Sequence, residues 1–583
     1  MKKILIPILG ALAVFTACNE DLLEIPQKGV ISTTNFYQTD EDAEAARVAV
    51  YQGLVWNVCA HNGVWNYNPN RFVWNLCADD MYAAGEFFGD NDYAAAMNEF
   101  RYDTNSEVIQ HAYQNYYYAM YYPNLVIHYF KDGLPNGKGH TDITRRAVAE
   151  AKVIRAYLHM MLAIGWGTPP KVDALLDPAA MPKNSSSQAD LLAWCAQECI
   201  DALPDLDERE STGDKAGAAK ATKGFANAVI GKCYLFMKDW TNAKKYLGDV
   251  IKSGKYALVS GENYWQNFHD EGDGNEEKIF EANIDRADVL NAFSFFQKSS
   301  FQEANIWMWR TDHFVANPAA VYNGNMTNGG WGGLGIPQHF VDKFIANDGL
   351  ESHRLKGTMV SIEDVVYNFE YLNADINAMT LEQKKASHDI GIDNRGLYGQ
   401  SFYLDVKQAA RKNDLYNYGG QNIRMNNFII MRYAEVLLMY AEACLELGDE
   451  PEARKYINMI QQRAGSKTVS STVDMNVLKT EKQLELWLEG IRWPDMVRWG
   501  DFDRAKNAGK DVTVLYDKFT REPKAEDKGV TYFYEGSRFY TVKVNPSAER
   551  GYDFGFKEGK HELFPFPFAV ASKNANLVQN PNW

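Results

Sequence analysis

The sequence is short of positive charge, cysteine and long hydrophobic runs, and each shortage excludes a class of protein. Its 60 Lys and Arg residues face 76 Asp and Glu, a net charge of -16. Binding to nucleic acid phosphates is therefore disfavoured. Apart from one segment at the N-terminus, no stretch approaches the about 20 apolar residues that a spanning helix needs. The H-E-x-x-H and G-x-S-x-G patterns are also missing, and with them the usual signs of a metalloprotease or a serine hydrolase.

The composition is that of a large globular protein with an excess of aromatic residues. Of 583 residues, 46% are hydrophobic and 23% are charged, which provides enough apolar material for a sizeable core. The length exceeds the about 50–250 residues of a typical domain, so we expect more than one lobe. The 33 Tyr, 30 Phe and 14 Trp are enough to fill a core and still line a binding surface.

The N-terminus has the pattern of a secretory signal. Lys2 and Lys3 precede an apolar run over residues 4–17, and Cys18 follows. The run is too short for a stable membrane anchor, so we predict a signal peptide over residues 1–17. Small residues before Cys18 resemble a bacterial lipobox, which predicts a lipidated tether over residues 18–34. Each methylene of an acyl chain such as palmitate contributes about 0.8 kcal/mol to membrane binding. The alternative is ordinary cleavage beside an incidental cysteine.

The other cysteines do not form a redox or metal motif. There is no C-x-x-C, and a chain of this size does not need disulfides to fold. We interpret the six thiols as core residues. They are Cys59, Cys77, Cys195, Cys199, Cys233 and Cys444.

Helical periodicity dominates the pattern. Apolar residues recur at i, i+3, i+4 and i+7 in segments that begin near residues 147, 226 and 433. The last two continue through short turns into second helices, and such helix pairs are typical of tetratricopeptide units. An Asn-, Gly- and aromatic-rich segment over about residues 262–421 separates them. We therefore predict a mainly α fold: a tetratricopeptide-like scaffold of helical pairs, a large loop-rich insertion lobe and few short strands, with hairpins near Tyr532–Val544.

Several separate motifs carry a resemblance to a known family. EEKIFE stands at residues 276–281 and RYAEVLLMYAEA at 432–443, and an E-L…E-G-x-R-W pattern begins at Glu485. The chain closes with FPFP from residue 564 and a terminal Asn-Pro pair. In these motifs the chain resembles the SusD/RagB family of surface nutrient-binding lipoproteins.

The resemblance implies a division of the mature chain and a place of action. It suggests a SusD-like N-terminal helical half over residues 35–261 and a SusD/RagB-like C-terminal half over residues 262–583. It also implies lipid anchoring at the outer face of the outer membrane beside a SusC-like TonB-dependent transporter. Family members bind glycans or, in some cases, peptides, and none is a known catalyst. We predict no cofactor, with calcium as the alternative.

Two aromatic regions are the candidate ligand platform, chosen from the residues rather than from the family. A sugar ring stacks its apolar face on an aromatic ring, and its hydroxyls bond neighbouring polar groups. For each single residue, buried packing is the alternative. The predicted ligand-binding residues are Tyr67, Trp74, Asp79 and Tyr82 in the first region and Trp307, Trp309 and Trp331 in the second.

Two acidic features are weaker candidates. Asp79 and Asp80 are adjacent, so in extended backbone they point apart and make a poor glycosidase pair, which needs two carboxylates about 5–10 Å apart. Asp79 is predicted to accept from a sugar hydroxyl, with a structural role as the alternative. Residues 269–277 are rich in oxygen ligands that suit calcium, but their spacing is not that of an EF-hand loop, and a solvated loop explains them equally well.

Together these patterns predict a cell-surface lipoprotein that captures oligosaccharide and delivers it to a transporter without altering it. A peptide-binding protein of the same uptake system and a helical-repeat adaptor without a ligand are the alternatives. A hydrolase, which would release product from the bound glycan, is the third class.

Overall fold

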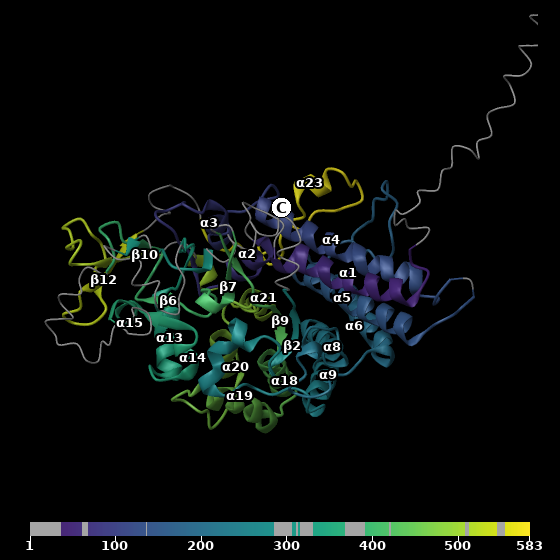
Figure 1. Ribbon diagram of the computed structural model, residues 1–583. Helices are drawn as coiled ribbons and strands as arrows, with labels where there is room; N and C mark the ends of the chain where they lie inside the picture. The colour runs from purple at the N-terminus through teal and green to yellow at the C-terminus, as the bar shows by residue number, and fades with distance from the viewer. Residues whose placement is uncertain are drawn as a thin grey trace, which may run out of the picture.

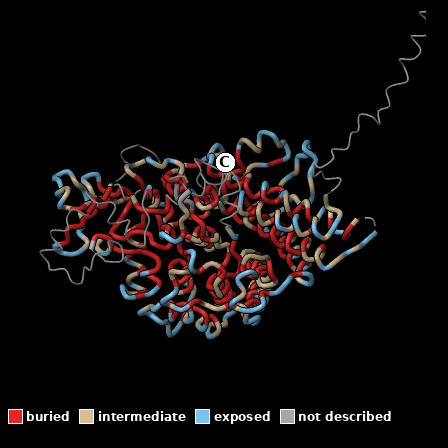
Figure 2. Tube along the Cα trace, in the orientation of Figure 1, coloured by how far each residue is buried: buried red, intermediate tan, exposed pale blue. Residues whose placement is uncertain are grey.

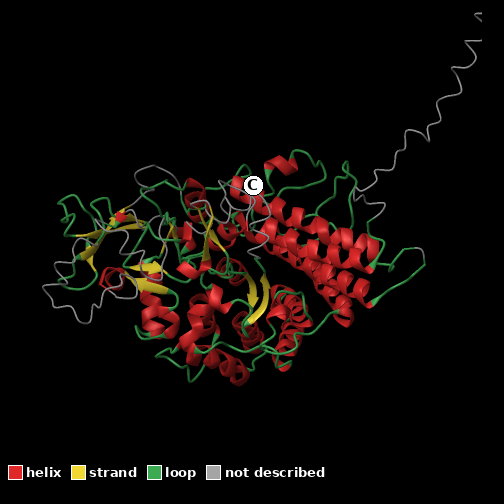
Figure 3. Ribbon diagram, in the orientation of Figure 1, coloured by secondary structure: helices red, strands yellow, loops and turns green. Residues whose placement is uncertain are grey.

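The computed structural model describes residues 36–60, 68–135, 137–284, 306–310, 313–314, 330–367, 391–418, 421–507, 512–544 and 554–583. Long helices occupy one side of the molecule and most of the short strands the other (Figures 1 and 3). The fold is mainly α with few short strands, as predicted.

Consecutive helices of the N-terminal half pack side by side. Helix α4 packs on α1 and α5, α5 on α6, α6 on α8 and α8 on α9. The bounds are α1 (Asp40–Leu54), continued by a π-helical turn (Val55–Ala60), α4 (Glu107–Phe130), α5 (Asp142–Trp166), α6 (Gln188–Ala202), α8 (Lys223–Phe236) and α9 (Trp240–Lys252). Thr39 and Thr141 cap α1 and α5 with their hydroxyls, which satisfies backbone N–H groups that have no partner within the helix.

The second helix pair continues this stack although it lies far along the chain. Helix α18 (Tyr433–Glu446) packs on α9 and on its own partner α19 (Glu450–Ala464). Gly448 adopts φ +77° in the turn that joins the pair, and the Asp449 side chain caps α19. Strand β2 (Lys278–Ala282) pairs with β9 (Phe428–Arg432), so the chain leaves the scaffold and returns to it at one place. The segment between them is an insertion into a continuous helical stack.

The insertion and the C-terminal part carry the short strands. One sheet has the order β11-β12-β10-β5, and its β11–β12 hairpin lies where the sequence predicts one. The strands are β1 (Tyr82–Ala83), β3 (Leu334–Gly335), β4 (Met359–Ser361), β5 (Leu397–Tyr398), β6 (Tyr403–Asp405), β7 (Leu415–Tyr418), β8 (Gln421–Arg424), β10 (Val512–Asp517), β11 (Thr531–Tyr532) and β12 (Phe539–Val544). The remaining helices are α2 (Pro69–Asn75), α3 (Asp92–Asn98), α7 (Lys215–Ala218), α13 (Gln338–Asp348), α14 (His353–Lys356), α15 (Ile362–Tyr367), α20 (Met475–Glu485), α21 (Arg492–Trp499) and α23 (Phe568–Ala571).

One hydrophobic core runs through both halves. It extends from Ala43 in α1 to Leu577 near the C-terminus, and Figure 2 shows buried residues on both sides of the molecule. All six cysteines of the described chain are buried free thiols. Burial raises the pKa of each of them, Cys444 to about 11, so these thiols are unreactive core residues.

Candidate functional site

The two aromatic regions meet at a short strand pair. Strand β1 carries Tyr82 and pairs antiparallel with β3, so Tyr82 lies opposite Gly335 and Ala83 opposite Leu334. The Ala84 N–H donates to the Gly333 carbonyl at 2.9 Å. Residues about 250 positions apart in the sequence thereby form one surface.

Close backbone packing places Trp331 on the outer side of this surface. Residues 330–333 run over residues 306–310, where the Gly332 N–H donates to the Met308 carbonyl at 2.7 Å. A Cβ at Gly330 would lie 2.0 Å from the Trp309 carbonyl oxygen, and one at Gly332 would lie 2.7 Å from Arg310 Cγ. Gly332 also has φ +57°, which side chains rarely adopt. Glycine on both sides of Trp331 therefore permits the approach.

The two tryptophans that lie beneath residues 330–333 are much less exposed than Trp331. Trp331 is 41% exposed, whereas Trp307 is 3% and Trp309 6% exposed. Trp309 donates its indole N–H to the Asp405 carbonyl at 2.8 Å, and the Arg71 guanidinium lies 5.4 Å from the Trp307 ring centroid. Burial of Trp307 and Trp309 favours the packing alternative for both, and Trp331 alone of the three presents its ring to solvent.

Charged side chains surround the exposed rings. Glu86 pairs with Arg395 at 3.0 Å and with Arg310 at 3.5 Å. The next residue, Phe87, is 58% exposed. We call the set Tyr82, Glu86, Phe87, Arg310, Trp331 and Arg395 the aromatic surface. It offers flat apolar faces beside hydrogen-bonding groups, the combination that a sugar ring needs.

Phe87 and the charged rim were not among the residues selected from the sequence. The signal for Phe87 was present in the Glu86-Phe87-Phe88 run, five residues after Tyr82. Tyr82 itself is only partly exposed and packs against a small cluster of Tyr398, Val512 and Val514. Its place in that cluster depends on strands that lie far along the chain.

Trp74 lies inside the core. It is 5% exposed, donates its indole N–H to the Tyr116 hydroxyl at 2.7 Å and packs edge-on against Trp166 and Phe564. The sequence left core packing open as the alternative for Trp74, and this environment favours it. The other aromatic candidate of the first region, Tyr67, lies outside the described residues, as does Cys18.

Asp79 forms a buried ion pair between the two halves of the chain. Arg492 donates to both of its carboxylate oxygens at 2.8 Å. Burial raises the pKa of Asp79, but the Arg492 charge outweighs it and the pKa lies below its usual range. Burial and the Asp79 charge raise the pKa of its neighbour Asp80 to about 7. This geometry favours the structural alternative for Asp79, because Arg492 occupies both oxygens.

The oxygen-rich segment at residues 269–277 is tied into the fold. His269 Nδ1 lies 2.7 Å from Asp414 Oδ2, and Asp273 accepts from the Asn427 N–H at 3.1 Å. Burial and the nearby Glu281 raise the pKa of Asp273 to about 7, which weakens it as a ligand for a cation. Among the residues that the structure describes, no three His, Cys, Asp or Glu side chains are arranged to hold a metal ion.

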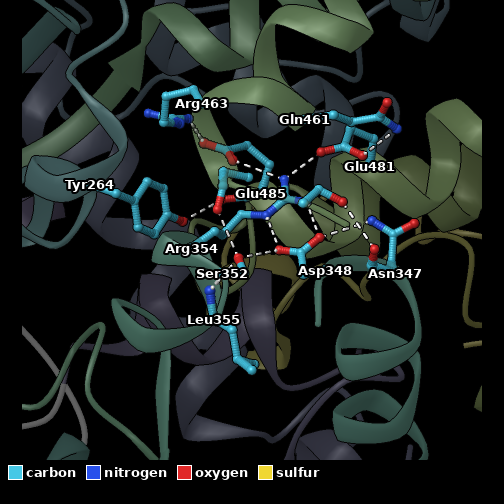
Figure 4. A network of polar contacts seen from close by, with 12 residues as sticks. Tyr264, Asn347, Asp348, Ser352, Arg354, Leu355, Gln461, Arg463, Glu481 and Glu485 are labelled. Carbon is cyan, nitrogen blue, oxygen red and sulfur yellow. Dashed lines mark hydrogen bonds and ion pairs between the residues drawn. The ribbon is translucent and has the colours of Figure 1, made fainter. Parts of the chain in front are cut away.

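Residues of the sequence motifs at 276–281 and 432–443, and of the pattern that begins at Glu485, meet in a buried ion network. Arg354 is fully buried and donates to Asp348, Glu481 and Glu485, and Arg463 joins Glu485 from α19 (Figure 4). Arg432 pairs with Glu485 and Glu277 at 2.6 Å. The network joins α13, α14, α19 and α20 to the β2–β9 pair, so these motif residues stabilise the fold.

Across the described ranges, no helix combines the length and the low polarity needed to cross a bilayer.

Comparison with known proteins gives consistent matches over most of the chain. A family model described as the SusD family matches residues 277–583. A SusD-like protein of Bacteroides ovatus is 22% identical over 626 aligned positions, which cover 100% of this chain and 97% of that protein.

Solved structures match the fold. A laminarin binding SusD-like protein superposes with a TM-score of 0.68 at 20% identity, and the match covers 94% of this chain and 100% of that protein. Surface glycan-binding protein A from Bacteroides thetaiotaomicron, solved in complex with laminarihexaose, has a TM-score of 0.65 at 20% identity and covers 93% and 100%. At this level of identity the superpositions establish the architecture.

Proposed function

The chain belongs to the SusD family, and on that premise we propose that it is a surface lipoprotein that captures glycan for a SusC-like TonB-dependent transporter. The observation that carries the proposal is the aromatic surface. It is formed where β1 meets β3, and it exposes Trp331 and Phe87 beside charged side chains. Of two solved proteins with the same fold, one is a laminarin binding SusD-like protein and the other was solved in complex with laminarihexaose, which supports a glycan as the ligand class.

Binding at this surface rests on stacking and hydrogen bonding. The exposed indole of Trp331 stacks on the apolar face of a sugar ring. Glu86 accepts from hydroxyl groups, while Arg310 and Arg395 donate to them. The Glu86–Arg395 ion pair holds the rim in place before the ligand arrives, which lowers the entropy cost of binding. Tyr82 extends the proposed platform from the first aromatic region. We propose binding without catalysis, so prolonged incubation with the bound glycan should release no product.

Anchoring and delivery complete the proposal. An acyl chain on Cys18 holds the protein at the outer face of the outer membrane, where large glycans arrive. The continuous helical stack gives the loops a rigid support, and the transporter receives the ligand from it. Copurification of the barrel transporter with the unaltered protein, in detergent, tests this partnership.

The test of the ligand class is affinity electrophoresis of the full chain through gels that contain a panel of glycans, laminarin included. We expect retardation by at least one glycan and its loss in Trp331→Ala, because the exposed ring is the main stacking face. Tyr121→Ala is the matched control, since Tyr121 is 56% exposed on α4 and lies outside the aromatic surface. Equal retardation of Trp331→Ala and the unaltered protein would place the ligand elsewhere. Binding of peptide mixtures with no retardation on any glycan would favour the peptide-binding alternative.

A further inference from the structure

The outermost part of the helical scaffold carries a row of exposed tyrosines. Helix α4 packs on α1, α2 and α5, and α5 leads into the rest of the stack, so α1 and α4 close one end of it (Figure 1). Tyr118 is 50% and Tyr121 56% exposed, whereas Tyr113 and Tyr116 of the same helix are buried in the core. Tyr118 and Tyr121 lie three positions apart and therefore project from neighbouring places on the helix surface. The end of a helical stack normally presents polar side chains to water, so exposed rings at this place require an explanation.

Ring contacts join this row to the first residues that the structure describes. Tyr121 and Tyr122 meet edge to face, with ring centroids 5.9 Å apart. The Tyr122 ring covers Gly53 of α1, where an added Cβ would lie 2.3 Å from the ring Cδ2. Tyr37 stacks on Tyr129 with 4.0 Å between ring centroids. Burial raises the pKa of Tyr37, and the neighbouring hydroxyls of Tyr129 and Tyr121 raise it further, so Tyr121 lies near this stacked pair. We call Tyr37, Tyr118, Tyr121, Tyr122 and Tyr129 the tyrosine face.

The helix that carries most of the tyrosine face has a long uncharged run. From Gln110 to Phe130, α4 contains no Lys, Arg, Asp or Glu, although these residues make up 23% of the chain. Solvent-facing positions of a surface helix normally carry such residues. The centre of a protein–protein interface has the opposite composition, because charged residues are depleted there and aromatic residues are enriched. The tyrosine face therefore has the composition of a surface that another protein covers.

A strained residue fixes the place where the N-terminal tether joins the scaffold. Tyr37 has φ +66°, a conformation that a bulky side chain adopts only when its surroundings hold it there. Its stacking on Tyr129 and its edge contacts with Phe36 and Phe130, at 4.6 and 5.8 Å between ring centroids, provide that support. The tether therefore joins the scaffold at the C-terminal end of α4, beside the tyrosine face.

The length of the tether limits how far this end of the stack can lie from the membrane. Phe36 stands 18 positions after Cys18. Fully extended, this stretch reaches at most about 65 Å. The proposed acyl chain on Cys18 thus holds the tyrosine face within reach of a barrel in the same membrane, at a high effective concentration.

A lipid surface fits this face less well than a protein does. Helices that lie on a membrane carry Lys and Arg beside their apolar side, and these bind anionic headgroups. Here the neighbouring charge is acidic, because the first turn of α1 contains Asp40, Glu41 and Asp42 directly after Tyr37. The net charge of -16 adds to the repulsion from anionic lipid. The same acidic edge suits a protein partner that has basic residues around an apolar centre.

We propose that the tyrosine face is the surface through which the protein docks on the extracellular side of its barrel transporter, an inference that rests on the partnership proposed above. Tyr118 and Tyr121 are the central contacts, because tyrosine provides a large rigid ring at low entropy cost and a hydroxyl that bonds the partner. The surface that receives them is apolar at its centre and basic at its edge. Docking through α1 and α4 does not use Trp331, so the aromatic surface keeps its separate role.

Affinity capture with the tagged full chain, from native membranes solubilised in detergent, tests the proposal. We expect the unaltered protein to retain a TonB-dependent barrel, identified by mass spectrometry. The double variant Tyr118→Ser, Tyr121→Ser should retain at least about tenfold less of it, the effect of losing a central interface contact. Tyr532→Ser is the matched control and should retain the normal amount, because Tyr532 is 43% exposed but lies on β11. Glycan retardation of the double variant should equal that of the unaltered protein.

Equal retention of the barrel by the double variant and the unaltered protein would overturn the docking surface and leave the partnership intact. Retention of no barrel by the unaltered protein would overturn the partnership and this surface with it, so the two failures are distinguishable. If the double variant does not fold, Tyr121→Ser alone decides the question.

Two further results would identify a different occupant and would also overturn the proposal. Loss of glycan retardation in the double variant would assign the tyrosine face to glycan. Binding of the unlipidated Cys18→Ala chain to vesicles of phosphatidylethanolamine and phosphatidylglycerol, lost when the two tyrosines are replaced, would assign it to lipid.

Discussion

Replacing Arg354 by methionine is expected to destabilise the protein by about 3–5 kcal/mol, the cost of removing one partner from a buried ion pair. Arg354 has no exposed surface and donates to Asp348 at 2.8 and 2.9 Å and to Glu485 at 3.1 Å, with Glu481 as a third partner. Methionine fills similar space but leaves three buried carboxylates without this cation. Asp348 keeps its bond from the Ser352 hydroxyl and Glu485 keeps Arg463, which limits the loss to the stated range.

Equilibrium unfolding by urea, followed by tryptophan fluorescence, measures this loss. Lys356→Met is the matched control, because its pair with Glu351 at 2.7 Å is exposed, with 59% and 92% of the side chains accessible. We expect the control to lie within about 0.5 kcal/mol of the unaltered protein. If both variants unfold at the same urea concentration, the network contributes no more than a surface pair, and its structural role is refuted.

Gly332→Ala should weaken glycan retardation without unfolding the protein, because the backbone there has φ +57° and an added Cβ would lie 2.7 Å from Arg310 Cγ. Gly448→Ala is the control for backbone strain alone, because Gly448 has φ +77° and an added Cβ would have no atom within 4 Å. Asp405→Asn should flatten the pH dependence of stability between pH 3.8 and about 7, where burial raises the pKa of this carboxyl to about 7. In that window the folded chain binds a proton that the unfolded chain has lost, so stability falls as pH rises, and thermal melts at pH 5 and 8 compare the two proteins. Cys18→Ala should release the protein from the membrane fraction and abolish labelling by a palmitate analogue, and retention of both would show that the anchor lies elsewhere.

The helical scaffold was predictable because its signals are local. Apolar periodicity in α5, α8 and α18, and the Gly448–Asp449 turn, depend on residues within a few positions of one another. The family motifs were equally visible, since each is a continuous run of residues. What those runs do was not visible. Glu277, Arg432 and Glu485 meet only when β2, β9 and α20 pack together.

The candidate site was predictable in part. The sequence located two aromatic-rich regions, and the β1–β3 pair brings them together at Tyr82. It could not rank the tryptophans, because whether a ring is covered depends on contacts with segments far away in the sequence. Trp307 and Trp309 are buried because residues 330–333 run over residues 306–310. That arrangement depends on backbone hydrogen bonds between the two segments.

The sequence by itself determined the helix pairs and the insertion between them, because each is specified by neighbouring residues. The lipidated N-terminus is a prediction from the same kind of local pattern. Tertiary structure alone decided which aromatic rings face solvent and which buried acidic residues pair with an arginine. Exposure and charge pairing depend on contacts between residues that lie hundreds of positions apart, such as Asp79 and Arg492. Local sequence patterns do not show which distant residues will come into contact.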